Sequence, residues 1–140
     1  MPTFNSRAEI KDYILEHSKD AVRLAANEAY AVFDKFLQQY YNEFDPSWYD
    51  RTYQLLHSLM RTNVRSTGNG WEAEVYFDIS SLEYMTGTWS EEKVMISAAH
   101  GSHGGYAPGT AVYYKPVGEL TAKHVKILKD ALIAAGIPVR

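Results

Sequence analysis

The chain has 140 residues, of which 46% are hydrophobic and 22% are charged, and its formal net charge is −3 at pH 7. This length and balance predict one folded domain over residues 1–140 and argue against a disordered chain or an overall attraction to nucleic acid. The absence of cysteine excludes disulfide scaffolds, thiol nucleophiles and thiolate metal sites. No apolar run approaches the ~20 residues that span a bilayer, and the N-terminus lacks signal-peptide features, so we expect a soluble, non-secreted domain without membrane contact.

A long helix is predicted over residues 6–44. Ser6 and Glu9 have the spacing of a capping box, in which the glutamate reaches back to the capping serine. Apolar residues then recur at helical spacing, and neither glycine nor proline interrupts the segment. The apolar stripe of so long a helix exceeds what a small domain covers, which favours packing against a neighbouring subunit. A shorter helix that breaks near Tyr40 is the alternative.

The segment after this helix is predicted to contain a break and a second helix. Asp45–Pro46 ends the first helix, because a residue before proline is disfavoured in the helical conformation. A short helix follows over residues 50–60, with Tyr53, Leu56 and Met60 on one face. Tyrosine is frequent, with 11 residues in the chain, and tyrosine is enriched both at interfaces and as a lining of cores. The aromatic residues near the break are therefore interface candidates: Tyr40, Tyr41, Trp48 and Tyr49.

Residues 61–79 are predicted to form a β-hairpin. Alternate residues from Trp71 to Ile79 are apolar, as in a strand that is buried on one face, and Gly68-Asn69-Gly70 suits a tight turn. Arg61 and Arg65 should lie opposite two acidic residues and form cross-strand ion pairs. The acidic residues of this hairpin are Glu72, Glu74 and Asp78.

The C-terminal half is predicted to contain two helices separated by a loop. Acidic residues open a short helix over 91–99, and a glycine- and histidine-rich loop follows over 100–110. Ala111–Tyr114 is a candidate strand that Pro116 ends. Thr121 then caps a helix over 121–135, in which Leu120, Val125, Leu128, Leu132 and Ile133 form the apolar face and Gly136 is the C-terminal cap.

Charge is divided unevenly along the chain. Residues 72–92 carry six acidic side chains and no lysine or arginine, whereas residues 115–140 are predominantly basic. Complementary surfaces on one chain suit head-to-tail contacts in a ring, although solvated helix faces also produce such patterns by chance.

The loop over 100–110 is the segment that looks most like a chemical site. His100 and His103 can chelate a metal, but a catalytic zinc site needs a third protein ligand, and no partner lies at a typical spacing. The glycines lack the lysine and following helix of a phosphate-binding loop, and no nucleophile elbow is present. We therefore expect no enzymatic activity, no cofactor and no metal, and interpret this loop as a contact segment.

Several segments together resemble one family. They are the long first helix, the stretch Tyr40-Tyr41-Asn42-x-Phe44-Asp45-Pro46 with Tyr49-x-Arg51-Thr52, and the loop His100-Gly101-x-His103-Gly104-Gly105. This order resembles the neck, or head–tail joining (tail-completion), proteins of long-tailed bacteriophages, and the resemblance covers nearly the whole chain.

The resemblance implies an α+β structural subunit of a virion. Such a subunit forms a six- or twelve-fold homo-oligomeric ring between portal, adaptor or stopper proteins and the tail tube or tail terminator, after assembly in the cytoplasm of the bacterial host. Genomic DNA passes through the ring without sequence-specific binding. The family has no catalytic residues, and its matched loop residues are interface candidates here: His100, Gly101, His103, Gly104 and Gly105.

We expect an antiparallel sheet of about three to five strands, with the long helix and the C-terminal helix packed on one face. The acidic residues Glu72, Glu74 and Asp78 are candidates to face the lumen, where like charge keeps DNA from adhering. Two other functions stay open. One is a small metal-dependent enzyme that uses His100 and His103, and the other is a phage-encoded regulatory or interaction protein.

Overall fold

The structure is a computed structural model, described for residues 2–43, 54–81, 95–96, 98–100 and 110–139. Its long elements are two helices, α1 (Arg7–Glu43) and α4 (Tyr114–Ala134). Between them lie the short elements α2 (Gln54–His57), β1 (Leu59–Arg61), β2 (Arg65–Ser66), β3 (Trp71–Glu72), β4 (Val75–Phe77) and the 3-10 helix η1 (Ile79–Ser81). The fold is α+β, as predicted.

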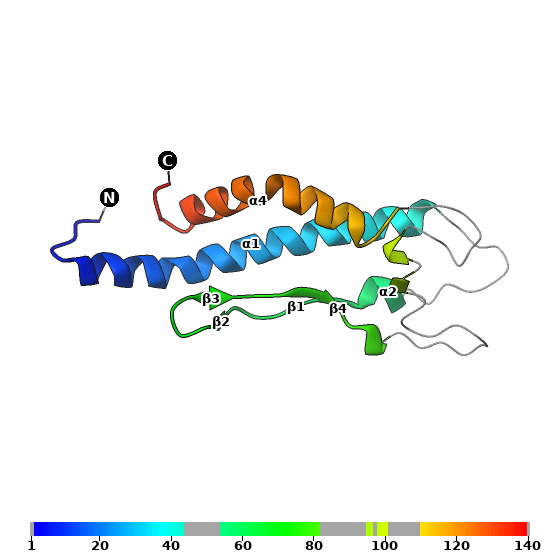
Figure 1. The fold of residues 1–140 in the computed structure, drawn as a ribbon, viewed down its shortest axis with the longest axis horizontal. Helices are drawn as coiled ribbons and strands as arrows, with labels where there is room; N and C mark the ends of the chain where they lie inside the picture. The colour runs from blue at the N-terminus through cyan, green and yellow to red at the C-terminus, as the bar shows by residue number, and fades with distance from the viewer. Residues whose placement is uncertain (1, 44–53, 82–94, 97, 101–109, 140) are drawn as a thin grey trace.

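Helix α1 runs along most of the length of the molecule (Figure 1). It has 37 residues, which corresponds to about 55 Å at 1.5 Å per residue. The backbone N–H of Glu9 donates to Ser6 Oγ at 3.2 Å, and the Glu9 carboxylate accepts from the N–H of Asn5 at 2.6 Å. The predicted helix over 6–44 is confirmed to within one residue at its start, whereas the reciprocal bond goes to Asn5 instead of Ser6. Asp45–Pro46 lies outside the described residues.

The four strands form one antiparallel hairpin with two ladders. Strand β1 pairs with β4, so that Arg61 lies opposite Val75, and β2 pairs with β3, so that Arg65 lies opposite Glu72. Between the two ladders, two residues of one strand, 63 and 64, lie opposite a single residue of the other, 73. One extra residue in one strand is the mark of a β-bulge. The predicted hairpin is confirmed, as is the exposure of Glu72 and Glu74, and the strand count lies within the predicted range.

Two boundaries around the hairpin differ from the prediction. The second helix ends at His57 and β1 begins at Leu59, so Met60 lies in a strand and not on the face of a helix over 50–60. At the other end, Ile79 belongs to η1 and is 38% exposed. Its predicted inward orientation is wrong, because the chain leaves the strand conformation after Phe77 and the period of two no longer applies.

Helix α4 begins seven residues before its predicted start. Tyr113 is its N-cap, so the predicted strand over 111–114 and the proline stop are wrong. Pro116 lies in the first helical turn, where its missing N–H leaves no helical hydrogen bond unmade. Thr121 is consequently inside the helix, and its hydroxyl donates to Val117 O at 2.7 Å. It does not cap the helix.

The C-terminal end of α4 follows the prediction. Gly136 has a φ of +92°, its N–H donates to Ile133 O at 3.0 Å, and the N–H of Ile137 donates to Leu132 O at 2.9 Å. This pair of bonds is a Schellman motif, which requires the left-handed conformation that glycine adopts most easily. The Tyr13 hydroxyl on α1 donates to Gly136 O at 2.8 Å. The end of α4 is thereby tied to the first third of α1.

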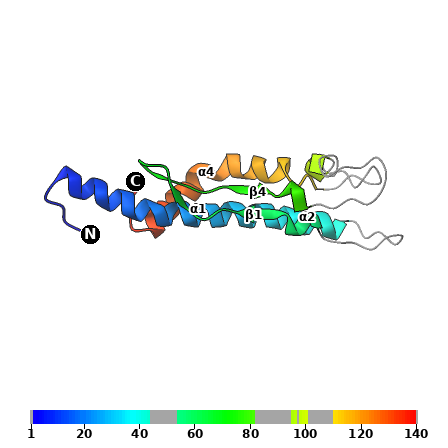
Figure 2. The ribbon, with the colours of Figure 1, turned by 90° about the horizontal axis from the view of Figure 1, so that it is seen from below.

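Helix α1 lies between α4 and the hairpin (Figure 1). Both helices therefore lie on the same side of the hairpin, as predicted, with α1 in direct contact with it. Seen from below, the hairpin runs along the two helices, and α4 crosses α1 at a shallow angle (Figure 2). The three layers give an elongated molecule.

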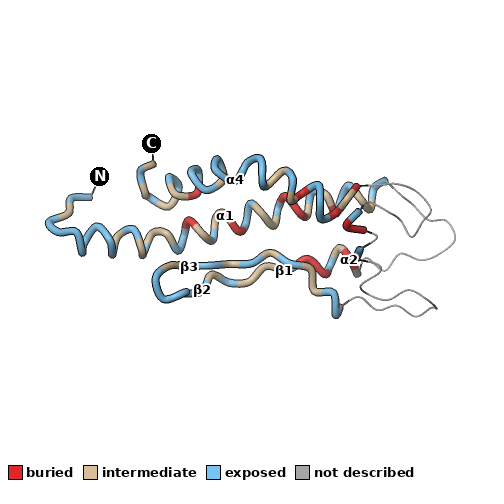
Figure 3. The backbone as a smooth tube through the Cα atoms, in the orientation of Figure 1, coloured by how far each residue is buried: buried red, intermediate tan, exposed pale blue. Residues whose placement is uncertain are grey.

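The hydrophobic core is concentrated at one end of the molecule, near the C-terminal end of α1 (Figure 3). Leu37 is completely buried there, and the ring of Phe33 meets that of Phe77 at 5.8 Å. The other buried members of the cluster come from α2, β1, residues 95 and 98–99 and the segment before α4: Leu55, Leu59, Met95, Ala98, Ala99 and Val112. The opposite end of α1 is held by a few separate contacts.

Candidate assembly surfaces

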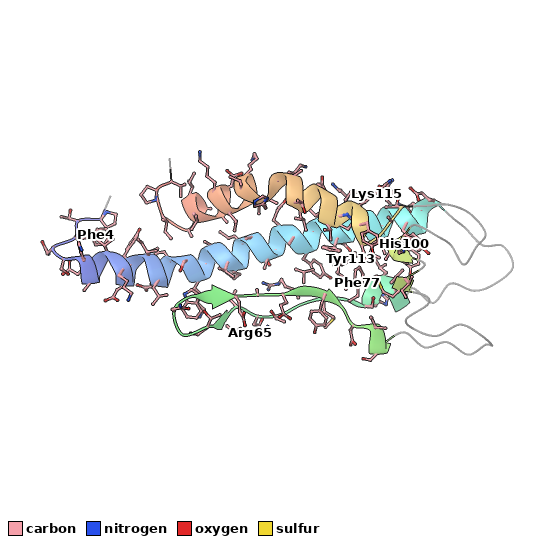
Figure 4. The ribbon with its side chains drawn as sticks, viewed as in Figure 1. Phe4, Arg65, Phe77, His100, Tyr113 and Lys115 are labelled. Atoms are coloured by element: carbon pink, nitrogen blue, oxygen red, sulfur yellow. The ribbon has the colours of Figure 1, made fainter. Side chains whose placement is uncertain are left out.

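His100 follows the helical residues 98–99 and lies beside the start of α4 (Figure 4). Its Nδ1 lies 2.9 Å from Ile96 O, and its ring lies 4.9 Å from that of Tyr114. Because a carbonyl oxygen only accepts, this contact favours a hydrogen on Nδ1 and leaves Nε2 as the acceptor of the ring. The other loop candidates lie outside the described residues: Gly101, His103, Gly104 and Gly105. Within the described part of the chain, no three histidine or acidic residues are grouped as metal ligands.

A carboxylate joins the end of α1 to the segment that leads into α4. Glu43 accepts a hydrogen bond from the hydroxyl of Thr110 and another from its backbone N–H, both at 2.6 Å. Thr110 is fully buried, so these bonds satisfy polar atoms that water does not reach. Chiefly through the hydroxyl bond, they hold the pKa of Glu43 below its ordinary value, and the charge of Lys115 acts in the same direction.

This lowered pKa predicts a loss of stability in acid. A carboxyl group whose pKa is lower in the folded state stabilises the fold above its unfolded pKa, and this contribution disappears as the pH falls through the folded pKa. We therefore expect the free energy of unfolding to decrease below about pH 4.5, the ordinary pKa of a glutamate, and we expect this decrease to be smaller in the Glu43→Gln variant. Urea unfolding of both proteins from pH 6 to pH 3 measures it. Identical pH profiles would contradict the role of Glu43.

The two described tyrosines of the predicted aromatic interface contact the protein's own core. Tyr40 and Tyr41 are half-buried, and their rings meet edge to face at 5.7 Å. The Tyr41 hydroxyl accepts from the backbone N–H of Leu56 at 3.3 Å. The buried parts of both side chains therefore line the core, which was the alternative to an interface role. Trp48 and Tyr49 lie outside the described residues, and an interface role of all four stays a prediction.

Two of the three acidic candidates, Glu72 and Glu74, lie on the exposed face of the hairpin, whereas Asp78 is half-buried and follows β4. Arg65 lies between two of them, with Nε 2.8 Å from Glu72 Oε1 and a terminal nitrogen 3.0 Å from Glu74 Oε1. These ion pairs raise the pKa of Arg65, chiefly through the bond to Glu72. Asp78 accepts from the hydroxyl of Ser80 at 2.5 Å. Arg61 was the other predicted ion-pair partner of this face. The ion pairs with Glu72 and Glu74 are both made by Arg65 instead.

Helices α1 and α4 enclose a groove of about 220 Å³ along one flank of the molecule. Its charged residues form a chain in which Glu119 lies 2.8 Å from Lys35 and 2.9 Å from Lys123. The two lysines lower the pKa of Glu119, with the bond to Lys35 the larger cause. We call this feature the α1–α4 groove, and it is lined by Glu28, Ala31, Val32, Lys35, Glu119, Leu120, Lys123 and Ile127.

The predicted apolar face of α4 is only partly covered. Leu120 and Leu132 are half-buried, whereas Val125 is 67% and Leu128 is 50% exposed. Ala131 is the buried residue of the second half of this helix. Ile133 is also exposed, at 49%, so the predicted apolar face is wrong for three of its five residues. We call Val125 and Leu128 the apolar ridge.

Comparison with known proteins supplies the family. A sequence model of the YomN family matches residues 6–134, which include both helices and the hairpin. Searches of curated proteins and of solved structures give no match. Within the described residues, no helix has the length and apolar character needed to cross a membrane. YomN is a phage-type family name, which points to a phage-derived protein. The match covers most of the chain, and the chain therefore belongs to the YomN family.

Proposed function

We propose that the chain is a structural subunit of a bacteriophage virion, which forms a homo-oligomeric ring at the head–tail connector. The observation that carries this proposal is the uneven covering of its long helices. The core occupies one end of α1, while Ile10 and Ile14 near the other end are 41% and 46% exposed. Helices that are left uncovered in this way gain burial by packing against neighbouring copies. The phage-type family name supports the phage origin that this proposal requires.

The presence of the chain in particles tests this function. Purified virions should contain it in a fixed copy number that matches a six- or twelve-fold ring, and loss of its gene should leave filled heads and separate tails. Quantitative mass spectrometry of particles and electron microscopy of the mutant lysate measure the two outcomes. A chain that is absent from washed particles, with joined heads and tails in its absence, would overturn the proposal.

The hairpin is the part of the subunit that we propose to face the lumen of the ring. Its exposed face carries Glu72 and Glu74, with Arg65 neutralising part of that charge, and the half-buried Asp78 follows the last strand. A surface with excess negative charge repels the phosphate backbone of passing DNA.

Reversal of this charge should slow the passage of DNA. In the Glu72→Lys/Glu74→Lys variant, lysines attract phosphates at the position where carboxylates repelled them, so we expect slower genome ejection in particles that still assemble. The lost ion pairs are exposed to solvent, which screens them, so the fold should remain intact. Ejection triggered in vitro measures the rate, and Lys11→Glu on α1 is the control for a change of surface charge elsewhere. Normal ejection and infectivity of the double variant would exclude the lumen position.

A further inference from the structure

The apolar ridge and the α1–α4 groove lie on different sides of α4. Successive residues of a helix are separated by about 100°, so Val125 lies about 200° and Leu128 about 140° around the helix from Lys123, which lines the groove. Both ridge residues are at least half exposed. The molecule thus has a protruding apolar feature on one flank and a hollow on another.

The groove is suited to receive an apolar side chain. Ala31, Val32, Leu120 and Ile127 supply apolar lining, and its volume of about 220 Å³ exceeds that of one leucine side chain. The charged rim residues Lys35, Glu119 and Lys123 already satisfy one another within the chain. An apolar group that enters the groove therefore need not break these ion pairs or strand a charge.

The charges next to the two features are complementary. Lys129 lies one turn after Val125 on the same face of α4, and Glu28 lines the groove. Among the ion pairs of the described residues, neither Lys129 nor Glu28 takes part. Glu28 acts on Lys126 only at longer range, where it contributes to a raised pKa of that lysine. The ridge is thus accompanied by a lysine and the groove by a carboxylate.

We propose that two copies of the chain associate head to tail, with the apolar ridge of one copy in the α1–α4 groove of the next and Lys129 beside Glu28 of that neighbour. Because ridge and groove are different surfaces, each copy offers both and the contact repeats from copy to copy. Such a heterologous contact closes a ring when its rotation divides a full turn. The inference rests on the proposed ring-forming function and names the contact that builds the ring.

Cysteine cross-linking tests this contact directly, because the chain contains no cysteine of its own. Ala31→Cys places a thiol in the groove, and Val125→Cys places one on the ridge. A short bismaleimide added to an equimolar mixture of the two concentrated proteins should give a heterodimer, while each variant alone should give little dimer. The double variant should give a ladder of oligomers or a closed ring. Asn69→Cys at the hairpin tip, mixed with Val125→Cys, is the matched control.

A heterodimer yield no higher than that of the Asn69→Cys control would overturn the proposal. Equal dimer yields from the single variants and from the mixture would also overturn it, because they indicate a symmetric contact. Cross-linking of a chain that is absent from virions would retain the contact and reject the virion function. Conversely, a chain that is present in virions but gives no specific heterodimer would retain the function and reject this contact.

Charge exchange provides a second, independent readout. Lys129→Glu should weaken self-association at least about tenfold in sedimentation equilibrium, because it places two carboxylates together, and adding Glu28→Lys to the same chain should restore it. Lys11→Glu should have no comparable effect. A double variant that associates as weakly as Lys129→Glu alone would contradict the pairing of these two residues.

Discussion

Leu37→Ala is expected to destabilise the fold by about 3 kcal/mol, the largest effect of any single truncation proposed for this chain. Leu37 is completely buried among residues of α1, α2, β1 and the start of α4. Its removal loses both the transfer free energy of the side chain and the contacts around the cavity that remains. For a chain of this size, such a loss lowers the melting temperature by about 10 °C. Thermal unfolding followed by circular dichroism measures it.

The control for this variant is Ile14→Ala on the same helix. Ile14 is 46% exposed and lies away from the core cluster, so its truncation should change stability by no more than about 0.5 kcal/mol in dilute protein. Equal losses for Leu37→Ala and Ile14→Ala would contradict a core that is confined to one end of α1.

Trp71→Ala is expected to cost about 2 kcal/mol and to release the tip of the hairpin from α1. The indole Nε1 donates to Leu15 O at 2.7 Å across 56 residues of sequence, and the ammonium of Lys19 lies 5.2 Å from the ring centroid. The half-buried ring therefore contributes apolar contact, one hydrogen bond and a cation–π interaction. The expected loss is below that of a fully buried tryptophan, which is ~3–5 kcal/mol.

Two further variants separate these contributions. Trp71→Phe keeps most of the ring and removes the N–H, so it should cost about 1 kcal/mol. Tyr76→Ala truncates an aromatic residue that is 43% exposed on the outer face of the same hairpin, and it should cost no more than about 0.5 kcal/mol. Urea unfolding gives the three values, and amide exchange of residues 65–72 reports the release of the tip. Protection unchanged in Trp71→Ala would mean that other contacts hold the hairpin.

The parts of the fold that depend on local signals were predictable. Each of these signals lies within a few neighbouring residues of the sequence. They are the capping residues and uninterrupted helical period of α1, the alternation of the strand after Trp71, and the glycine that ends α4. Pro116 misled the prediction because proline both ends helices and starts them. Inside a helix, proline lacks the N–H that would donate to the carbonyl of residue i−4 and its ring clashes with that carbonyl, whereas in the first turn there is no helical carbonyl at that position.

Contacts between distant segments were not predictable in the same way. Glu43 and Thr110 are 67 residues apart, and neither belongs to a motif. The ion pair of Glu119 with Lys123 has the local i,i+4 spacing and could have been found, whereas Lys35 joins it only because α1 and α4 pack together. The hydrophobic period of the sequence identifies an apolar stripe on α4. It does not tell which side of α4 is covered by α1. That ambiguity concealed the exposed Val125 and Leu128.

The position of the core at one end of α1 has a consequence for how the chain opens. Local unfolding of a segment requires the loss of only those contacts that the segment itself makes. The first third of α1 is held by Trp71 and by the bond from Tyr13 to Gly136, while residues around Leu37 share the main core. Amide exchange should therefore accelerate along α1 toward its N-terminus without global unfolding. Association that covers this end would then appear as slower exchange there, even if the melting temperature of the core stayed the same.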